Sequence, residues 1–367
     1  MSKPPQVPRI HGWPVSPYTE KVRCYLRYFQ IPHTVEVPTA WALQRRIQRA
    51  VGRMIMPTVE LPSGQWVQDS SDIIDYFESS ASGPHATPEH ALGRLLSALF
   101  EYFGDEWLPI LAMHTRWNNE ENRAFARDEF AAYGFPWLPR SLGRRLVAPI
   151  TEKMSSYREI LGVTDASIPG VERMAQTVLC ALNEHLQHAP FLLGGRPCVG
   201  DFALVGPLYA HVYRDPGSRR MFDDVPAVVA WMERARRTST TPGEFSLAPA
   251  KMGALAPIIR MIFEEQWAFA AAVVEAINTF RHAHPDKSLP RGLGWRPCTI
   301  GGVDSRRKIA TESQWKIQRV LDVYDQEEVR SDHDVQELLT RMGGQQLRDM
   351  KVEAPVVRRH GRAVFRD

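Results

Sequence analysis

Ser16 and Pro17 predict the start of a helix with a hydroxyl group at its N-terminus. Proline is favoured at the first helical position, and serine is a favourable N-cap immediately before it. The free backbone N–H groups and the positive end of the helix dipole stabilise an anion there, including a thiolate. A thiol bound beside Ser16 would accept a hydrogen bond from the hydroxyl, which would lower the pKa of the thiol. The alternative interpretation is that Ser16 only caps the helix.

Two further segments offer groups to a small peptide. Pro57, after Met56, opens a predicted strand, and a cis bond between them would free backbone groups to pair with a peptide in strand fashion. Asp69 and Ser70 stand at a predicted helix start, where the carboxylate suits an ammonium and the hydroxyl and N–H groups suit a carboxylate. Those are the needs of the γ-glutamyl end of glutathione. A strand-initiating proline and a helix cap are the plain structural alternatives.

The composition limits the class of protein. With 367 residues, 44% hydrophobic and 24% charged, the chain is long enough for two domains or slightly more and is typical of a globular protein. A net charge of +3 is too small to indicate nucleic-acid binding, and the scattered basic runs are typical of a solvated surface. No apolar stretch reaches membrane length, and the N-terminus lacks a secretory signal pattern. We expect a cytoplasmic protein that binds neither nucleic acid nor a membrane.

The cysteines form no C-x-x-C pair and no metal-ligand pattern; they are Cys24, Cys180, Cys198 and Cys298. We therefore expect reduced thiols and no metal. Cys24 lies inside the first predicted helix, where we expect it to be buried.

Periodicity predicts an alternating first part and a helical remainder. Strands are predicted at 7–13, 34–37, 57–61 and 65–68, and helices at 17–30, 41–51 and 69–80. A Ser-, Gly-, Ala- and Pro-rich segment at 79–88 predicts a linker. Helices are then predicted at 88–113, 120–132, 140–160, 167–189, 200–214, 225–237, 253–284, 308–325 and 332–342, with a Gly/Pro-rich stretch at 289–303 and strand-like pieces at 349–357 and 362–366.

The motifs at 16–23, 56–57 and 69–73 resemble the glutathione transferase superfamily. The pattern Ser-Pro-Tyr-x-x-Lys-Val-Arg is similar to the omega class, but omega proteins carry cysteine where this chain has Ser16, which is similar to serine-type classes. The resemblance implies Ser16 at the catalytic position and glutathione as co-substrate. It also implies that Met56, with Pro57, contacts the cysteinyl part and that Asp69 and Ser70 bind the γ-glutamyl group.

The resemblance implies an α/β thioredoxin-like N-terminal domain followed by an all-α domain, in a homodimer. We expect the glutathione-binding domain at 1–80, a linker at 81–87, the helical domain at 88–247 and a mainly helical extension with a basic tail at 248–367. Residues 299–324 loosely resemble a long bacterial subgroup. The extension either packs on the helical domain alone or also covers the substrate cleft.

Three features of this chain can be compared with the pattern of the glutathione transferase superfamily residue by residue. The segment 194–203 resembles the capping box of the family, in which Asp201 caps a buried helix, here with Cys198 at the N-cap. In many relatives a lysine binds the glycyl carboxylate of glutathione, and this chain has Ile55 at that position. Arg53, or else Arg45 or Arg46, would then bind the glycyl carboxylate in place of the lysine. The family places its electrophile pocket between the domains. Pocket candidates are Trp13, Tyr18, Trp107, His114, Arg116 and Trp117, for which interdomain packing is the alternative.

The sequence therefore predicts a detoxifying glutathione transferase-like enzyme in which Ser16 stabilises the glutathione thiolate for attack on a hydrophobic electrophile. A non-catalytic binding or scaffold protein is one alternative, favoured by Ile55 and the extension. A glutathione-dependent reductase or lyase is the other.

Overall fold

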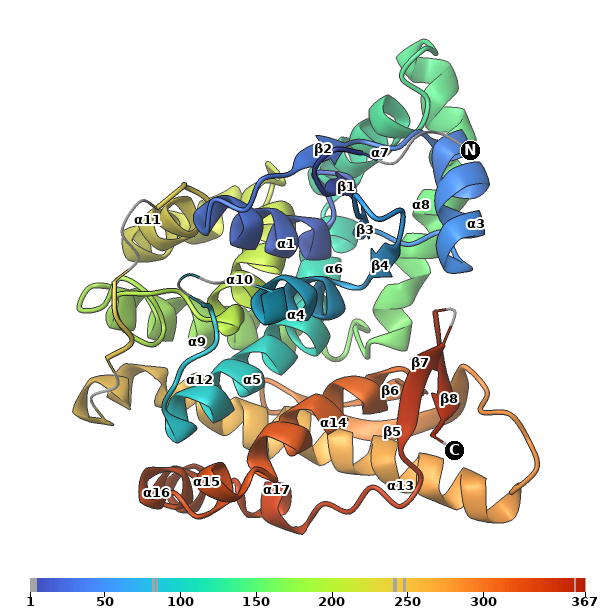
Figure 1. Cartoon of the computed structure of the whole chain (residues 1–367). Coiled ribbons are helices and arrows are strands. Elements are labelled where there is room, and N and C mark those ends of the chain that lie inside the picture. Colours follow the sequence, from blue (N-terminus) through green and yellow to red (C-terminus); the bar gives the residue numbers. More distant parts are fainter. Residues whose placement is uncertain are drawn as a thin grey trace.

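Four short strands form the mixed sheet of the N-terminal domain (Figure 1). The computed structural model describes residues 5–80, 83, 85–239, 243–246, 249–359 and 361–366. The strand order is β2-β1-β3-β4; β1 pairs parallel with β2 and antiparallel with β3, and β3 pairs antiparallel with β4. The elements are β1 (Arg9–His11), α1 (Pro17–Tyr28), β2 (Thr34–Glu36), α2 (Ala40–Ala42), η1 (Leu43–Ile47), α3 (Gln48–Val51), β3 (Thr58–Glu60), β4 (Trp66–Gln68) and α4 (Ser70–Ser80). This is the predicted thioredoxin-like arrangement.

The apolar residues that gave the predicted periodicity are buried in this domain. Val22 and Leu26 of α1 and Ile74 of α4 are fully buried, as are Ile10 and Val59 of the central strands. Helices α1 and α4 contact each other. Their N-termini, at Ser16 and Ser70, carry two of the predicted site residues.

The second part of the chain is helical, as predicted. Its elements are α5 (Ala91–Glu106), α6 (Leu108–Asn118), α7 (Glu120–Gly134), α8 (Arg140–Ile160), α9 (Ile168–Leu186), α10 (Val199–Pro207), η2 (Leu208–Tyr213), η3 (Arg219–Phe222) and α11 (Pro226–Ala235). The prediction of one helix over 88–113 was wrong, because α5 ends at Glu106 and a separate helix, α6, begins at Leu108. Pro109, in the first turn of α6, cannot continue the hydrogen bonding of α5.

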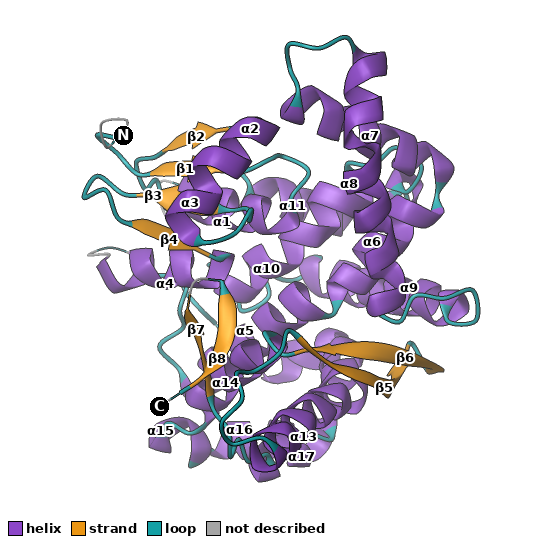
Figure 2. Cartoon of the chain, turned by 90° about the vertical axis from the view of Figure 1, so that its right-hand side faces the viewer, coloured by secondary structure: helices purple, strands orange, loops and turns teal. Residues whose placement is uncertain are grey.

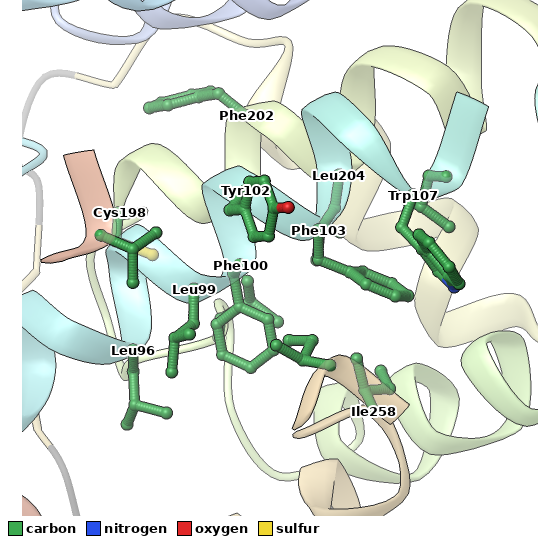
Figure 3. Packing of buried hydrophobic residues seen from close by; sticks show 14 of the residues in the cluster. Leu96, Leu99, Phe100, Tyr102, Phe103, Trp107, Cys198, Phe202, Leu204 and Ile258 are labelled. Atoms are coloured by element: carbon green, nitrogen blue, oxygen red, sulfur yellow. The ribbon is translucent and has the colours of Figure 1, made fainter. Parts of the chain in front are cut away.

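Helix α10 is the buried centre of the molecule. Figure 3 shows Leu204 of α10 on the side of Phe103 of α5, whereas Phe202 points away from α5 and its ring contacts Tyr25 and Phe29. The two helices approach closely, since a Cβ atom at Gly104 would lie 2.5 Å from the backbone of Ala203. The backbone of these helices therefore fixes the position of α5 below α1 and α4.

Asp201 holds the N-terminus of α10. Its carboxylate accepts hydrogen bonds from the backbone N–H groups of Cys198 (2.8 Å) and Leu192 (3.0 Å) and from the indole of Trp231 (2.8 Å). Burial raises the pKa of Asp201 above its usual range. A carboxylate with three donors in the core has a folding role.

The C-terminal extension contains strands as well as helices. Its elements are η4 (Pro249–Leu255), α12 (Ala256–Met261), η5 (Ile262–Gln266), α13 (Trp267–Ala283), β5 (Gly292–Ile300), β6 (Val303–Ala310), α14 (Ser313–Tyr324), α15 (Glu327–Arg330), α16 (His333–Met342), α17 (Gln345–Asp349), β7 (Val356–Arg359) and β8 (Arg362–Phe365). Figure 2 shows the hairpins β5–β6 and β7–β8 in this part. The predicted helix at 308–325 begins later, at Ser313, because the preceding residues belong to β6.

The extension packs against the earlier parts of the chain. Helix α14 contacts α5 and lies beside it in Figure 1, and β5 contacts α9. Residues 81, 82 and 84 of the predicted linker and the predicted boundary at 247 and 248 lie outside the described residues. The four cysteines are free thiols, and Cys24 is buried as predicted. No helix in the described part of the chain combines the length and the apolar character that crossing a membrane requires.

Candidate active site

Ser16 is the N-cap of α1. Its backbone is extended (φ −88°, ψ 121°), and its Oγ accepts a hydrogen bond from the backbone N–H of Thr19 at 3.3 Å. The preceding carbonyl, that of Val15, accepts a hydrogen bond from Arg116 at 3.1 Å, and His211 Nε2 lies at the same distance from it. Since the Ser16 oxygen is used here as an acceptor, its proton remains available to a ligand. The side chain is half-buried at the positive end of a twelve-residue helix.

The peptide bond between Met56 and Pro57 is cis. Pro57 is buried, whereas Met56 is half-buried and packs against the apolar cluster around Trp13 and Ile47. Strand β3 begins directly after this bond, at Thr58.

Asp69 has a left-handed backbone, with φ at 73°. This conformation is uncommon for a residue other than glycine and occurs where the surrounding structure requires it. One carboxylate oxygen accepts hydrogen bonds from the Ser71 N–H (2.9 Å) and from Lys316 Nζ (3.3 Å), and the other lies 2.6 Å from Arg358 Nη1. Burial alone would raise the pKa of Asp69, but Lys316 and Arg358 hold it well below its usual range.

Ser70 begins α4 and is almost completely buried, at 1% exposure. Its hydroxyl has no hydrogen-bond partner among the described residues. The same holds, within the described chain, for Nε of Arg358 and for the side-chain oxygen of Gln68. Unpaired polar atoms therefore occur on both chain neighbours of Asp69 and on Arg358, which contacts it.

Arg53 is also engaged by the extension. Its Nη1 donates to Glu312 Oε1 and to the carbonyl oxygen of Gly361, both at 2.8 Å. Gly361 lies at the turn between β7 and β8. The extension therefore contacts two of the predicted glutathione-binding side chains, Arg53 and Asp69.

A buried charge cluster joins the three parts of the chain. Lys21 of α1 contacts Glu101 (2.7 Å) and Asp105 (2.8 Å) of α5, and Lys316 of α14 contacts Asp105 (2.6 Å). Ser71 Oγ donates to Glu101 at 2.6 Å and accepts from Lys316 at 2.6 Å. Sequence reasoning missed these residues. The usable signal was the pair of acids four positions apart inside the otherwise apolar segment of α5.

Two pocket candidates remain half-exposed. The hydroxyl of Tyr18 donates to the carbonyl of Asp105 at 2.9 Å, and burial raises the pKa of Tyr18 well above its usual range. His114 Nδ1 lies 2.8 Å from Asn118, and burial lowers the pKa of His114.

The other four pocket candidates are buried. Trp13 donates to the carbonyl of Pro38 at 2.6 Å, and both Trp13 and Trp117 contact the ring of Phe130. Trp107 packs against Arg307 of β6. Arg116 makes two hydrogen bonds of 2.7 Å with the carboxylate of Asp215. These contacts give the four side chains packing partners within the chain itself.

One exposed group of potential metal ligands occurs among the described residues. It consists of His333, Asp334 and Glu337 in α16, whose ligand atoms lie within 4.8 Å of one another. Exposed acidic groups of this kind are common without a metal ion.

Comparison with known families gives a match to the N-terminal domain of glutathione S-transferases over residues 10–85. No curated protein matches the chain. Among solved structures, the chain is similar to FzlA from C. crescentus, with 16% identity, a TM-score of 0.41, and coverage of 68% of this chain and 99% of that one. A glutathione S-transferase from Sinorhizobium meliloti 1021 gives 15% identity, a TM-score of 0.42 and coverage of 65% and 90%. The beta-etherase LigF from Sphingobium sp. strain SYK-6 gives 14% identity, a TM-score of 0.42, and coverage of 62% of this chain and 94% of that one.

Proposed function

We propose, from the premise that this chain carries the N-terminal domain of the glutathione S-transferase superfamily, that it binds a glutathione-type thiol beside Ser16 and transfers it to a hydrophobic electrophile. The observation that supports this proposal most directly is the place of the Ser16 hydroxyl. It stands at the N-terminus of α1, it is half-buried, and its oxygen already accepts from Thr19, so its proton can be donated.

The proposed chemistry is a nucleophilic displacement. The thiol gives its proton to solvent, and the resulting thiolate accepts a hydrogen bond from Ser16. A sulfur lone pair forms the new carbon–sulfur bond, and the leaving group departs with the electrons of the bond that breaks. Ser16 keeps its proton, so its contribution is to stabilise and orient the sulfur anion.

The electrophile is proposed to lie beside Tyr18 and His114, the two half-exposed members of the predicted pocket. Trp13, Trp107, Arg116 and Trp117 would support this region from the packed interior. Met56 and Pro57 are proposed to present the backbone to the cysteinyl part of the thiol. The resemblance also implies a cytoplasmic homodimer with a detoxifying role, and the mass of the protein in solution tests the homodimer.

Substitution of Ser16 by alanine tests the proposal. A hydrogen bond to a charged group contributes about 1.5–3 kcal/mol, so the conjugation rate should fall roughly 10- to 100-fold. The dependence of the rate on pH should also shift upward, because the thiol loses the group that lowers its pKa. The assay is conjugation of glutathione with chlorodinitrobenzene.

Thr39→Ala is the matched control. Thr39 caps α2 in the same domain and accepts from the Ala42 N–H at 3.2 Å, so Thr39→Ala removes a comparable cap from a different helix. Removal of either cap should cost about 1 kcal/mol of stability. The proposal fails if Ser16→Ala conjugates as fast as Thr39→Ala.

A non-catalytic binding or scaffold protein is the second candidate. It is favoured by the contacts of Arg53 and Asp69 with the extension, which occupy side chains proposed for glutathione. Retention on immobilised glutathione without turnover of any electrophile would support it over the enzyme.

A further inference from the structure

The acidic end of the proposed site is covered by two cations of the extension. Lys316 of α14 and Arg358 of β7 each contact a different oxygen of Asp69. Arg358 is itself held by Asp72, by the carbonyl of Gln68 and by the ring of Trp315, 4.0 Å away. Figure 1 shows α14 and β7 gathered on the side of the molecule below α4. These contacts make the cover a packed part of the fold.

This cover changes what Asp69 can bind. A free carboxylate at this position would attract the α-ammonium group of a γ-glutamyl peptide. Here, an incoming ammonium would meet Lys316 and Arg358 at hydrogen-bond distance from the same two oxygens. Like charges brought together at an interface are strongly disfavoured. While the extension is docked, the position therefore opposes a cationic group.

The same position retains donors for an anion. The Ser70 hydroxyl is buried at the N-terminus of the eleven-residue helix α4, and neither it nor Nε of Arg358 has a partner among the described residues. A carboxylate oxygen can accept from both kinds of donor and is stabilised at a helix N-terminus. Arg358 also pairs with Asp72, and Lys316 also pairs with Asp105, so each cation is shared between Asp69 and one further carboxylate.

Resting on the proposed function, we propose that the thiol bound by this protein carries a carboxylate without an ammonium group at the end beside Asp69. Lys316 and Arg358 are the residues that set this selectivity. The corresponding ligand class is acidic acyl-cysteinyl peptides of the glutaryl type, in which the α-amino group of glutathione is replaced by hydrogen.

The experiment compares the affinities of glutathione and glutaryl-cysteinylglycine by titration calorimetry on the full-length protein. The wild-type protein should bind the des-amino peptide at least about tenfold more tightly. In Lys316→Gln/Arg358→Gln this preference should fall to equality or reverse, because Asp69 becomes free to accept the ammonium.

Arg319→Gln is the matched control. Arg319 extends from the same helix and contacts Asp75 (2.5 Å) and Glu101 (3.4 Å) but is not paired with Asp69. Its substitution weakens docking of the extension yet should leave the preference unchanged. If Arg319→Gln loses the preference to the same extent, docking of the extension, and not the pairing of Lys316 and Arg358 with Asp69, determines which peptide binds. That result would overturn the inference.

The other outcomes separate the two proposals. If the wild-type protein binds glutathione as tightly as the des-amino peptide, the inference is wrong and the proposed function stands. If neither peptide binds to any form, both proposals fail. Should the double variant not fold, the wild-type ratio decides the inference by itself.

Discussion

Substitution of Asp105 by asparagine should be one of the most destabilising changes of charge in this protein. The side chain of Asp105 is 1% exposed, and its Oδ2 lies 2.8 Å from Lys21 Nζ and 2.6 Å from Lys316 Nζ. Asparagine has nearly the same shape but no charge. The two buried ammonium groups would each lose an anionic partner that no water can replace at the same distance.

The expected loss follows from these two contacts. A hydrogen bond between charged groups contributes about 1.5–3 kcal/mol, which gives roughly 3–6 kcal/mol for the pair. Removal of one partner from a buried ion pair typically costs about 3–5 kcal/mol. Because Lys21 keeps Glu101 and Lys316 keeps Asp69, we expect about 3–5 kcal/mol rather than the upper sum.

The free energy of unfolding in urea, followed by circular dichroism at pH 7, measures this loss. Asp75→Asn is the control, because Asp75 also pairs with a cation of α14, Arg319, but its side chain is 53% exposed. Loss of an exposed ion pair should lower the free energy of unfolding by less than about 1 kcal/mol. The reasoning is refuted if the two variants lose the same stability.

Two further changes test other parts of the fold. His11 is fully buried between β2 and β3, and burial lowers its pKa to about 4. Since the unfolded chain titrates near 6.5, the folded state binds fewer protons between these values, and stability is lost as the pH falls through this window. Relative to His11→Phe, the free energy of unfolding of the wild-type protein in urea should fall by about 2 kcal/mol between pH 7 and pH 5. If the difference in unfolding free energy between the two proteins is the same at both pH values, the burial argument is wrong. Asp201→Ala should lower the unfolding free energy by about 3 kcal/mol, since three donors lose their acceptor, and thermal denaturation that is unchanged would exclude the capping role.

The N-terminal domain could be predicted closely because its signals are local. Pro17 marks the start of α1, and residues 62–64 separate β3 from β4, between the strands predicted at 57–61 and 65–68. Each of these signals acts within a few residues of its effect. The same locality gave helix α8 over 140–160.

The hairpin β5–β6 was missed although its turn was visible. Gly301 and Gly302 both have positive φ, at 55° and 74°, which is the backbone that a two-residue hairpin turn requires. Pro297 and the glycines at 292 and 294 obscured the strand that precedes the turn, because such residues are unfavourable in strands. The seven residue pairs that join β5 and β6 outweigh that local preference.

The contacts of the candidate site with the extension could not be predicted from local patterns. Lys316 and Asp69 are separated by 247 positions, and Lys316 and Asp105 by 211. An isolated lysine in an amphipathic helix is typical of a solvated surface. Only the docking of α14 on α5 turns Lys316 into a buried cation that needs an anionic partner.

This dependence couples the stability of the extension to the choice of ligand. Each buried cation has partners in another part of the chain: Lys21 pairs with α5, and Lys316 pairs with both α5 and Asp69. A change that frees Asp69 for an ammonium group therefore also removes an interaction that holds the extension in place. Docking of the extension and the proposed exclusion of the γ-glutamyl ammonium both depend on the same ion pairs.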